Sequence, residues 1–407
     1  MWCFGSHCGL DFNTNPPAIF TNSINAIEGC ASISDKITGQ LLFYTDGGSV
    51  WNKNHLLMPS VINGTLGGST STTQSAIIVP DPSSVSKYFI FTCDFQAHSK
   101  GLQYVKIDMS LNGGLGDIVS SPIQLITPIS EKLTATINSN GYDYWIIVHQ
   151  WNTASFYVYP LTNIGVGAPV ISTIGSIHSM GGFNVNSIGY MKLSPNGKKI
   201  ALAISILNIV EIFDFNQSTG IISNPISDNS YGTTLNVDLY GLSFSPNSNV
   251  LYVSQSNNQA IYQYNLASGI NAAILSSKTK VDSLLGHISA LQLAPDGKIY
   301  GAIYNSQQLI KISNPNLLGT ACNLIHNAVT FPLSQTIKHG LPNVFENIFV
   351  NCNVRQICNG ANYTIGSHTY TKSGNYRDTL ISYLGLDSTV VTNLFVLPIS
   401  NKNINIF

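Results

Sequence analysis

The 407-residue sequence predicts an all-β chain: a seven-bladed β-propeller over about residues 1–350, then a small β-sandwich-like module over about 351–396. The main observation is a repeated unit in which a short apolar strand, a tight polar turn and a second apolar strand follow one another. Proline followed by Asn or Asp is typical of a type I turn, and the apolar flanks are typical of buried strands. The clearest copies are residues 188–204, 240–254 and 288–303.

Weaker copies of the same unit come earlier, at residues 31–45, 74–92 and 132–148. Successive turn centres are separated by 45, 59, 56, 51 and 49 residues. Two more short strands follow the clearest pairs, so that each unit holds four strands, a pattern typical of propeller blades. The turn centres are Lys36, Asp81, Asn140, Asn196, Asn247 and Asp296, and the added strands are 209–215 and 220–222, 260–265 and 272–275, and 308–312 and 323–325.

The two ends of the propeller sequence complement each other. Residues 340–349 read as one more inner strand with nothing after it to complete a blade. Residues 2–4, 9–12 and 18–21 are three short strands before the first inner strand. We therefore expect a seventh blade built from both ends, with Trp2 close to Phe345, because closure removes the exposed edges of an open sheet.

The pattern changes from about residue 353. Short alternating strands are expected at 361–364, 368–371, 374–381 and 388–396, and residues 397–407 are expected to form an extended tail. A module of this size is near the lower limit for an independent core.

Composition excludes several classes of function. Charged residues make up 9% of the chain and the net charge is −1, which argues against a nucleic-acid binder or a polybasic membrane-surface protein. No apolar run approaches the roughly 18 residues of a membrane-spanning helix, so no membrane insertion is expected. No signal peptide is visible, and the chain looks like a mature or trimmed form. Polarity carried by Asn, Ser and Thr suits an extracellular β-rich protein.

Seven cysteines show neither a CxxC pair nor a Cys/His zinc spacing. The close pairs are Cys3/Cys8 and Cys352/Cys358, and Cys352–Cys358 is the candidate disulfide. For the remaining three, Cys30, Cys93 and Cys322, buried free thiols and bonded cysteines are both left open.

Candidate binding residues lie in the loops that follow second strands or precede inner strands. Aromatic faces and amide groups there suit sugar rings or peptide backbones, although the same rings could simply cover the ends of the blades. His287 and His339 are expected to be structural, and a metal site from three of the loop histidines would require those loops to converge. The candidates are Asp46, Asp94, Phe95, His98, His149, Trp151, His178, Asn257 and Tyr304.

No strong catalytic motif is present, and no GxSxG, HExxH or phosphate-binding GxxxxGK sequence occurs. Glu211 and Asp214 share a strand but are separated by an odd number of positions, so they are expected to point to opposite faces. No cofactor and no metal are predicted.

Three N-terminal stretches carry a resemblance to a known family: residues 2–12, 28–35 and 41–52, with 67–76 fitting the same pattern. Together they resemble the N-terminal propeller of large secreted surface proteins exported by type IX secretion. Residues 363–391 are similar to a short repeat of such proteins, and 403–407 look like the start of a sorting tail. That repeat usually pairs its cysteine with one in a GCDS-like turn. Here the turn is Gly385-Leu386-Asp387-Ser388, a departure that favours Cys352–Cys358.

The resemblance implies an export route and a compartment more than an activity. We therefore expect a secreted or cell-surface binding protein, such as an adhesin, whose loop face contacts an extracellular glycan or protein. One alternative is a polysaccharide hydrolase or lyase that uses Asp46, Asp94, His98 or His149. Another is a structural subunit that associates with copies of itself. Two carboxyl groups, or an acid and a histidine, meeting at one point of the central funnel would favour the enzyme, whereas a lining of Ser, Thr and Gly would oppose it.

Overall fold

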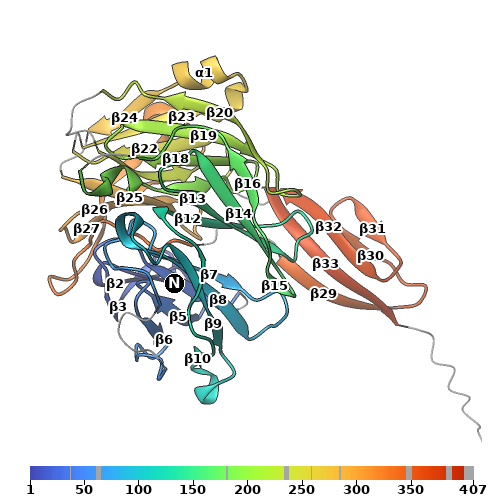
Figure 1. Ribbon diagram of the computed structural model, residues 1–407. Coiled ribbons are helices and arrows are strands. Elements are labelled where there is room, and N and C mark those ends of the chain that lie inside the picture. The colour runs from blue at the N-terminus through green and yellow to red at the C-terminus, as the bar shows by residue number, and fades with distance from the viewer. Residues whose placement is uncertain are drawn as a thin grey trace, which may run out of the picture. The chain divides into compact units, whose positions relative to one another are not determined.

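The computed structural model describes residues 1–36, 38–60, 66–179, 182–232, 238–257, 259–283, 286–344, 351–381 and 387–397. It divides into two compact units, Met1–Glu346 and Asn347–Phe407. The first unit is a seven-bladed β-propeller, which confirms the predicted fold class (Figure 1). In the described residues, no helix is long and apolar enough to cross a membrane.

Each blade is an antiparallel sheet whose strands follow one another in the chain. The first blade is β4 (Ala31–Ser34), β5 (Leu41–Thr45) and β6 (Val50–Asn52). The second is β7 (Ala76–Pro80), β8 (Lys87–Cys93), β9 (Leu102–Asp108), β10 (Asp117–Ile118) and β11 (Ile123–Ile126). The third is β12 (Ile129–Ile137), β13 (Tyr144–Gln150), β14 (Ser155–Thr162), β15 (Gly165–Val166) and β16 (Val170–Thr173).

The next three blades have four strands each. The fourth is β17 (Met191–Leu193), β18 (Lys199–Ile204), β19 (Ile209–Phe215) and β20 (Ile222–Asp228). The fifth is β21 (Leu239–Phe244), β22 (Val250–Gln255), β23 (Ala260–Asn265) and β24 (Thr279–Ser283). The sixth is β25 (Ile288–Leu293), β26 (Ile299–Ile303), β27 (Gln308–Ile312) and β28 (Leu324–Thr330). Short 3-10 turns are η1 (Phe95–Ala97), η2 (Asn112–Gly114), η3 (Gly182–Ser187), η4 (Leu266–Ser268) and η5 (Gly319–Cys322).

The seventh blade is built from both ends of the propeller chain, as predicted. The N-terminal strands β1 (Trp2–Phe4), β2 (Ser6–Asp11) and β3 (Ala18–Asn25) form its sheet. The Ser6 N–H donates to the Thr336 carbonyl at 2.8 Å, and the Asn343 N–H donates to the Cys30 carbonyl at 2.7 Å. Residues 336–343 therefore join the N-terminal strands to the ring. Phe345, which was expected to mark this contact, lies outside the described residues.

The repeated turns share one hydrogen-bond pattern. In the fourth blade, Ser194 Oγ donates to Asn196 Oδ1 at 2.8 Å and accepts from the Lys199 N–H at 2.9 Å. In the fifth blade, Ser245 Oγ does the same with Asn247 and Val250, at 2.8 and 2.9 Å. These short polar side chains satisfy backbone groups that the turn leaves unpaired.

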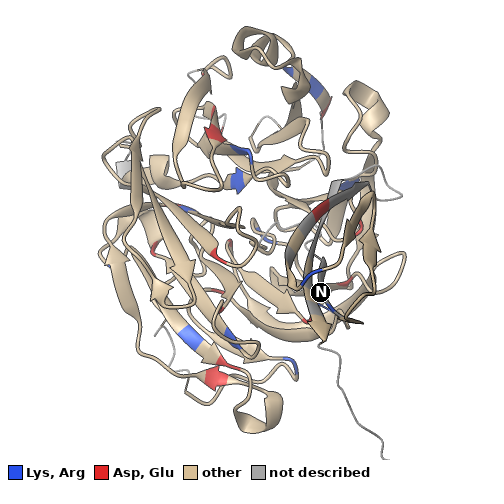
Figure 2. Cartoon of the chain, turned by 90° about the vertical axis from the view of Figure 1, so that its right-hand side faces the viewer, with Lys and Arg blue, Asp and Glu red and all other residues tan. Residues whose placement is uncertain are grey.

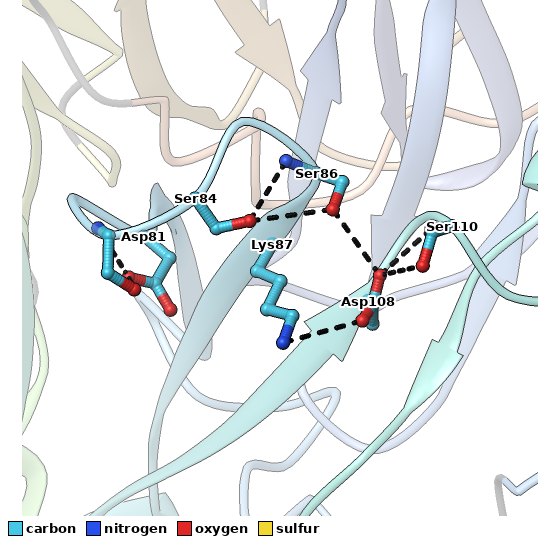
Figure 3. Close-up of polar contacts among 7 residues, drawn as sticks. Asp81, Ser84, Ser86, Lys87, Asp108 and Ser110 are labelled. Atoms are coloured by element: carbon cyan, nitrogen blue, oxygen red, sulfur yellow. Dashed lines mark hydrogen bonds and ion pairs between the residues drawn. The ribbon is translucent and has the colours of Figure 1, made fainter.

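A turn of the second blade uses an acid in the same way (Figure 3). Asp81 Oδ1 accepts from the Ser83 N–H at 2.8 Å and from its hydroxyl at 2.6 Å. On the neighbouring strands, Lys87 Nζ lies 3.6 Å from Asp108 Oδ2, and Asp108 also accepts from Ser110. The carboxylates of Asp81 and Asp108 therefore accept hydrogen bonds within local turns, and Asp108 also forms a surface ion pair.

One predicted strand is wrong. Residues 272–275 were expected to be the fourth strand of the fifth blade, but they lie in helix α1 (Asn271–Ser276), and β24 supplies that strand. The segment contains Ala272, Ala273 and Leu275, which are strong helix formers. Only Ile274 of this helix is buried, so the segment lacks the apolar face of a packed strand.

The C-terminal unit contains a three-stranded sheet in the order β29 (Asn351–Cys358), β33 (Asp387–Leu397) and β32 (Gly374–Ile381), in which β29 and β33 are parallel. A hairpin of β30 (Tyr363–Ile365) and β31 (His368–Tyr370) completes it. Strand β29 was not predicted, and the tail from residue 398 lies outside the described residues.

The predicted Cys352–Cys358 disulfide is also wrong, because both cysteines lie in the single extended strand β29 and Cys358 carries a free thiol. A strand rises about 3.3 Å per residue, so their Cα atoms are about 20 Å apart, whereas bonded cysteines need about 7 Å or less. Cys3, Cys8, Cys30, Cys93 and Cys322 are buried free thiols.

Candidate functional site at the mouth of the central channel

The two predicted acids serve their own loops. Asp46 Oδ1 accepts from the Gly48 and Ser49 N–H groups at 2.9 and 2.7 Å. Asp94 caps η1 through the Phe95 N–H and accepts from the Lys100 N–H, both at 2.9 Å. Both carboxylates are thus fixed by backbone donors of their own loops.

The predicted histidines do not form one cluster. His149 and His178 are fully buried and stack on each other with ring centroids 3.5 Å apart. Their ring nitrogens have no hydrogen-bond partner among the described residues. His98 is exposed and instead contacts the edge of Phe95, with centroids 5.6 Å apart. In the part of the chain that the structure describes, no group of three or more His, Cys, Asp or Glu residues could hold a metal ion.

The remaining candidates have mixed surroundings. Trp151 is buried. Asn257 Nδ2 donates to Asp238 Oδ2. Tyr304 is partly exposed and stacks on His339 with centroids 3.8 Å apart. Of the predicted set, Phe95, His98, Asn257 and Tyr304 therefore keep some accessible surface.

A different group of residues converges at the starts of the inner strands. Tyr240, in the fifth blade, donates its hydroxyl hydrogen to Glu28 Oε2 at 3.0 Å, and Glu28 lies just before the first blade. These two blades are not neighbours in the ring, so this hydrogen bond crosses the central channel. Because Glu28 precedes an inner strand, it lies at the loop face, where edge strands connect to the next blade.

A second carboxyl group lies beside the first. Glu131 Oε2 accepts from the N–H and the hydroxyl of Thr73, at 2.8 and 2.7 Å, and Oε1 accepts from the Gln96 N–H at 2.9 Å. Glu131 is fully buried, whereas Glu28 is partly exposed. Charged side chains are rare in this molecule (Figure 2), which makes two neighbouring carboxyl groups at the axis unusual.

The surroundings of Glu28 favour its protonated form. Burial and, after it, the negative charge of Glu131 together raise its pKa to about 8, against hydrogen bonds from Tyr240 and Thr73 that act in the opposite direction. Burial also raises the pKa of Glu131, against the hydrogen bonds from Thr73 and Gln96. Glu28 therefore carries a proton near neutral pH.

His339 lies on the same rim and is the complementary group. Its Nδ1 is 2.8 Å from Ser289 Oγ, and its ring centroid is 5.8 Å from that of Tyr240. Burial, and to a smaller extent the nearby His287 and Lys338, lower its pKa to about 4. The imidazole is therefore neutral near neutral pH, and its Nε2 has no partner among the described residues.

Below this rim, amide groups close the channel. Gln74 of the second blade pairs with the Met191 backbone of the fourth, accepting at 2.8 Å and donating at 3.0 Å. Asn343 donates to the Leu133 carbonyl of the third blade at 2.8 Å. These hydrogen bonds link the second, third and fourth blades and the closing segment across the channel.

A cavity with a volume of about 380 Å³ lies elsewhere, at the outer part of the second blade near β9, β10 and β11. Its described lining is apolar or carries serine, and it contains no acid or base. It does not contribute to the chemistry at the channel.

No family model and no curated protein matches this chain. Among solved structures, it is similar to hydrazine synthase from Kuenenia stuttgartiensis (13% identity, TM-score 0.47, covering 79% of this chain and 90% of that one). It is also similar to a streptogramin B lyase (12% identity, TM-score 0.47, 78% and 88% covered). A third is the periplasmic gluconolactonase of Pseudomonas aeruginosa (12% identity, TM-score 0.43, 70% and 77% covered). At this level of identity, such likeness concerns the fold alone.

Proposed function

We propose that this protein is an extracellular enzyme that cleaves a polysaccharide by acid–base chemistry at the mouth of its propeller channel. The observation that carries the proposal is the meeting of Glu28, Tyr240 and His339 around one opening. General acid–base catalysis needs a proton donor and a proton acceptor. The protonated carboxyl group of Glu28 can be the donor, and the neutral imidazole of His339 can be the acceptor.

Each group has a defined role in this proposal. Glu28 donates a proton to the oxygen that leaves, and Tyr240 holds the Glu28 carboxyl group in place. His339 accepts a proton through Nε2, while Ser289 fixes the other ring nitrogen. Since the pKa of Glu28 is about 8 and that of His339 about 4, the active protonation states coexist between these values. We expect activity to fall below about pH 4 as His339 gains a proton, and above about pH 8 as Glu28 loses one.

The test uses two variants and one control. Glu28→Gln and His339→Gln should each lower the release of reducing ends from a susceptible polysaccharide by about 10²- to 10⁴-fold. His98→Gln, on an exposed loop of the same face, should leave the rate unchanged. Circular dichroism checks that all three variants are folded. If no polysaccharide in a broad panel is cleaved by the wild-type chain, the proposal is wrong.

An extracellular location is the second part of the proposal. Its support is the resemblance of residues 2–12, 28–35 and 41–52 to propellers exported by type IX secretion, together with polarity carried by Asn, Ser and Thr. Expression in a host with and without that machinery, followed by assay of the medium, tests it. Equal amounts in the medium of both hosts would contradict the route.

Binding without chemistry is the second candidate function. The exposed His98 against the edge of Phe95 supports it, because this pair offers an aromatic and polar contact on the loop face. A glycan array probed with the Glu28→Gln variant separates the two functions. Retention of glycans together with an absence of cleavage by the wild-type chain would favour an adhesin.

A further inference from the structure

The rim beside His339 carries a cation that the acid–base pair does not use. Lys338 Nζ donates to Asn305 Oδ1 at 2.7 Å and lies 5.9 Å from the centroid of the Tyr304 ring. That ring stacks on His339. An ammonium group is therefore held next to the imidazole by a neighbour from the sixth blade.

The opposite side of the opening is acidic. Glu28 lies across Tyr240, whose ring separates it from His339. The mouth thus presents an ammonium group, a neutral imidazole, a phenol and a protonated carboxyl group in that order. This order would suit a ligand with three features in sequence. Its negative charge would face Lys338, its acidic C–H group would face His339, and its leaving oxygen would face Glu28.

The second carboxyl group is not free to take part. Glu131 is fully buried and accepts three hydrogen bonds, from Thr73 and Gln96. Glycoside hydrolysis commonly needs two carboxyl groups that flank the bond, one as acid and the other as nucleophile or base. Only Glu28 is placed for such a role, and the available base is an imidazole beside a cation.

From this arrangement we infer that the substrate is a polyuronide, a glycan whose sugars carry carboxylates, and that its chain is cut by β-elimination. The inference rests on the proposed function. His339 Nε2 removes the proton from the carbon that bears the carboxylate. The released electron pair forms a double bond to the adjacent carbon, and the bond from that carbon to the glycosidic oxygen breaks. The leaving oxygen takes the proton of Glu28.

The step is balanced without a further reactant, since His339 gains one proton and Glu28 loses one, and both are restored through solvent. Lys338 neutralises the carboxylate of the sugar, which makes the neighbouring C–H group more acidic. Tyr304 stacks on His339 and Asn305 accepts a hydrogen bond from Lys338, so the two side chains are fixed relative to each other. Lys338 is thus a specificity-determining residue, and a neutral glycan gives it nothing to bind.

The experiment incubates the full chain with polygalacturonate, alginate and chondroitin, and with neutral laminarin and xylan. Two signals are followed separately: reducing ends, and the ultraviolet absorbance of the unsaturated uronic acid that only elimination creates. We expect both signals to rise together on at least one polyuronide and neither on the neutral glycans. Lys338→Gln should lower the rate about 100-fold, the usual size for loss of one charge-stabilising group. Lys100→Gln, on an exposed loop of the same face, is the matched control and should keep the wild-type rate.

The outcomes separate the two proposals. Reducing ends without ultraviolet absorbance would overturn elimination but leave a polysaccharide-cleaving enzyme. Cleavage of neutral glycans alone, or a Lys338→Gln variant as active as wild type, would overturn the polyuronide assignment. No reducing ends on any polymer would overturn the proposed function as well.

Discussion

Two pairs of ionisable groups near the loop face have opposite surroundings. At the channel mouth, Glu28 and His339 are partly exposed, and each is oriented by a hydrogen-bonded neighbour, Tyr240 or Ser289. In the third blade, His149 and His178 are fully buried against each other, without hydrogen-bond partners among the described residues. The comparison teaches that residue type alone does not identify a site. A titratable group can react with a ligand only where it is both oriented and reachable.

The largest expected difference between the two regions is in catalysis. Substituting a histidine in each region tests it, as His339→Gln and His149→Phe. Loss of the base should lower the rate about 10²- to 10⁴-fold. His149→Phe keeps an aromatic ring in edge-to-face contact with Phe156, so its rate should stay at the wild-type value. Equal losses in both variants would remove the distinction between the regions, and initial rates on one polymer at pH 7 measure it.

The second largest effect is expected from a substitution in the segment that closes the ring. An added Cβ at Gly340 would lie 1.7 Å from the Glu28 carbonyl oxygen, whereas one at Gly48 would meet nothing closer than 3.5 Å. Gly340→Ala should therefore lower the free energy of unfolding by about 3 kcal/mol, the upper range for overpacking. It should also reduce activity, because the displaced backbone carries Glu28 and His339. Gly48→Ala is the control in urea unfolding, and a Gly340→Ala variant as stable as the control would contradict the packing described for the closing segment.

The third effect concerns the stability of the fold at acidic pH, which should depend first on the buried histidines His149 and His178. Burial, together with the charge of Lys132, lowers the pKa of His149 to about 3. Burial also lowers the pKa of His178 well below its usual value, and His149 and Lys132 act in the same direction. The unfolded chain therefore binds more protons below about pH 6.5, and the free energy of unfolding should fall with pH from there toward about pH 3. The expected slope is up to about 1.4 kcal/mol per pH unit for each imidazole.

His178→Phe should halve that slope, and His98→Phe, at an exposed position, should leave it unchanged. Urea titrations at several pH values measure all three chains. Identical slopes for wild type and His178→Phe would mean that the pair does not govern acid stability.

The smallest effect is expected in the C-terminal unit. Cys358 carries a free thiol at one end of β29, so Cys358→Ser should change the free energy of unfolding by less than about 0.5 kcal/mol. Thiol counting with and without a reductant is the complementary measurement. Fewer titratable thiols before reduction would show that a disulfide forms after all.

Much of the propeller could be predicted from local signals. The Ser194 and Ser245 turns repeat in sequence because each must satisfy the same backbone groups. Closure could also be predicted, since unmatched strands at the two ends complete each other. Helix α1 was missed because four apolar residues between turns fit a short strand and a short helix equally well.

The candidate site was harder to predict, because a blade pattern does not show which side chains face the axis. The prediction favoured loops with aromatic residues and acids, yet Asp46 and Asp94 bond to their own loops and Trp151 is buried. Glu28 and Glu131 occupy similar places in the first and third repeats, near the start of an inner strand. That shared position was the available signal. Their contact with Tyr240 and Thr73 depends on long-range closure that no local pattern encodes.

The acid and the base come from opposite ends of the propeller chain, and the closing segment that carries His339 and Gly340 bonds to the Ile27 backbone beside Glu28. A partly made chain therefore holds only one of the two groups that the proposed function requires. Under that proposal, activity begins only when the last segment docks, and the polypeptide is inactive during synthesis and any unfolded transit. One protease cut that released this segment would then abolish the proposed activity while leaving six of its sheets intact.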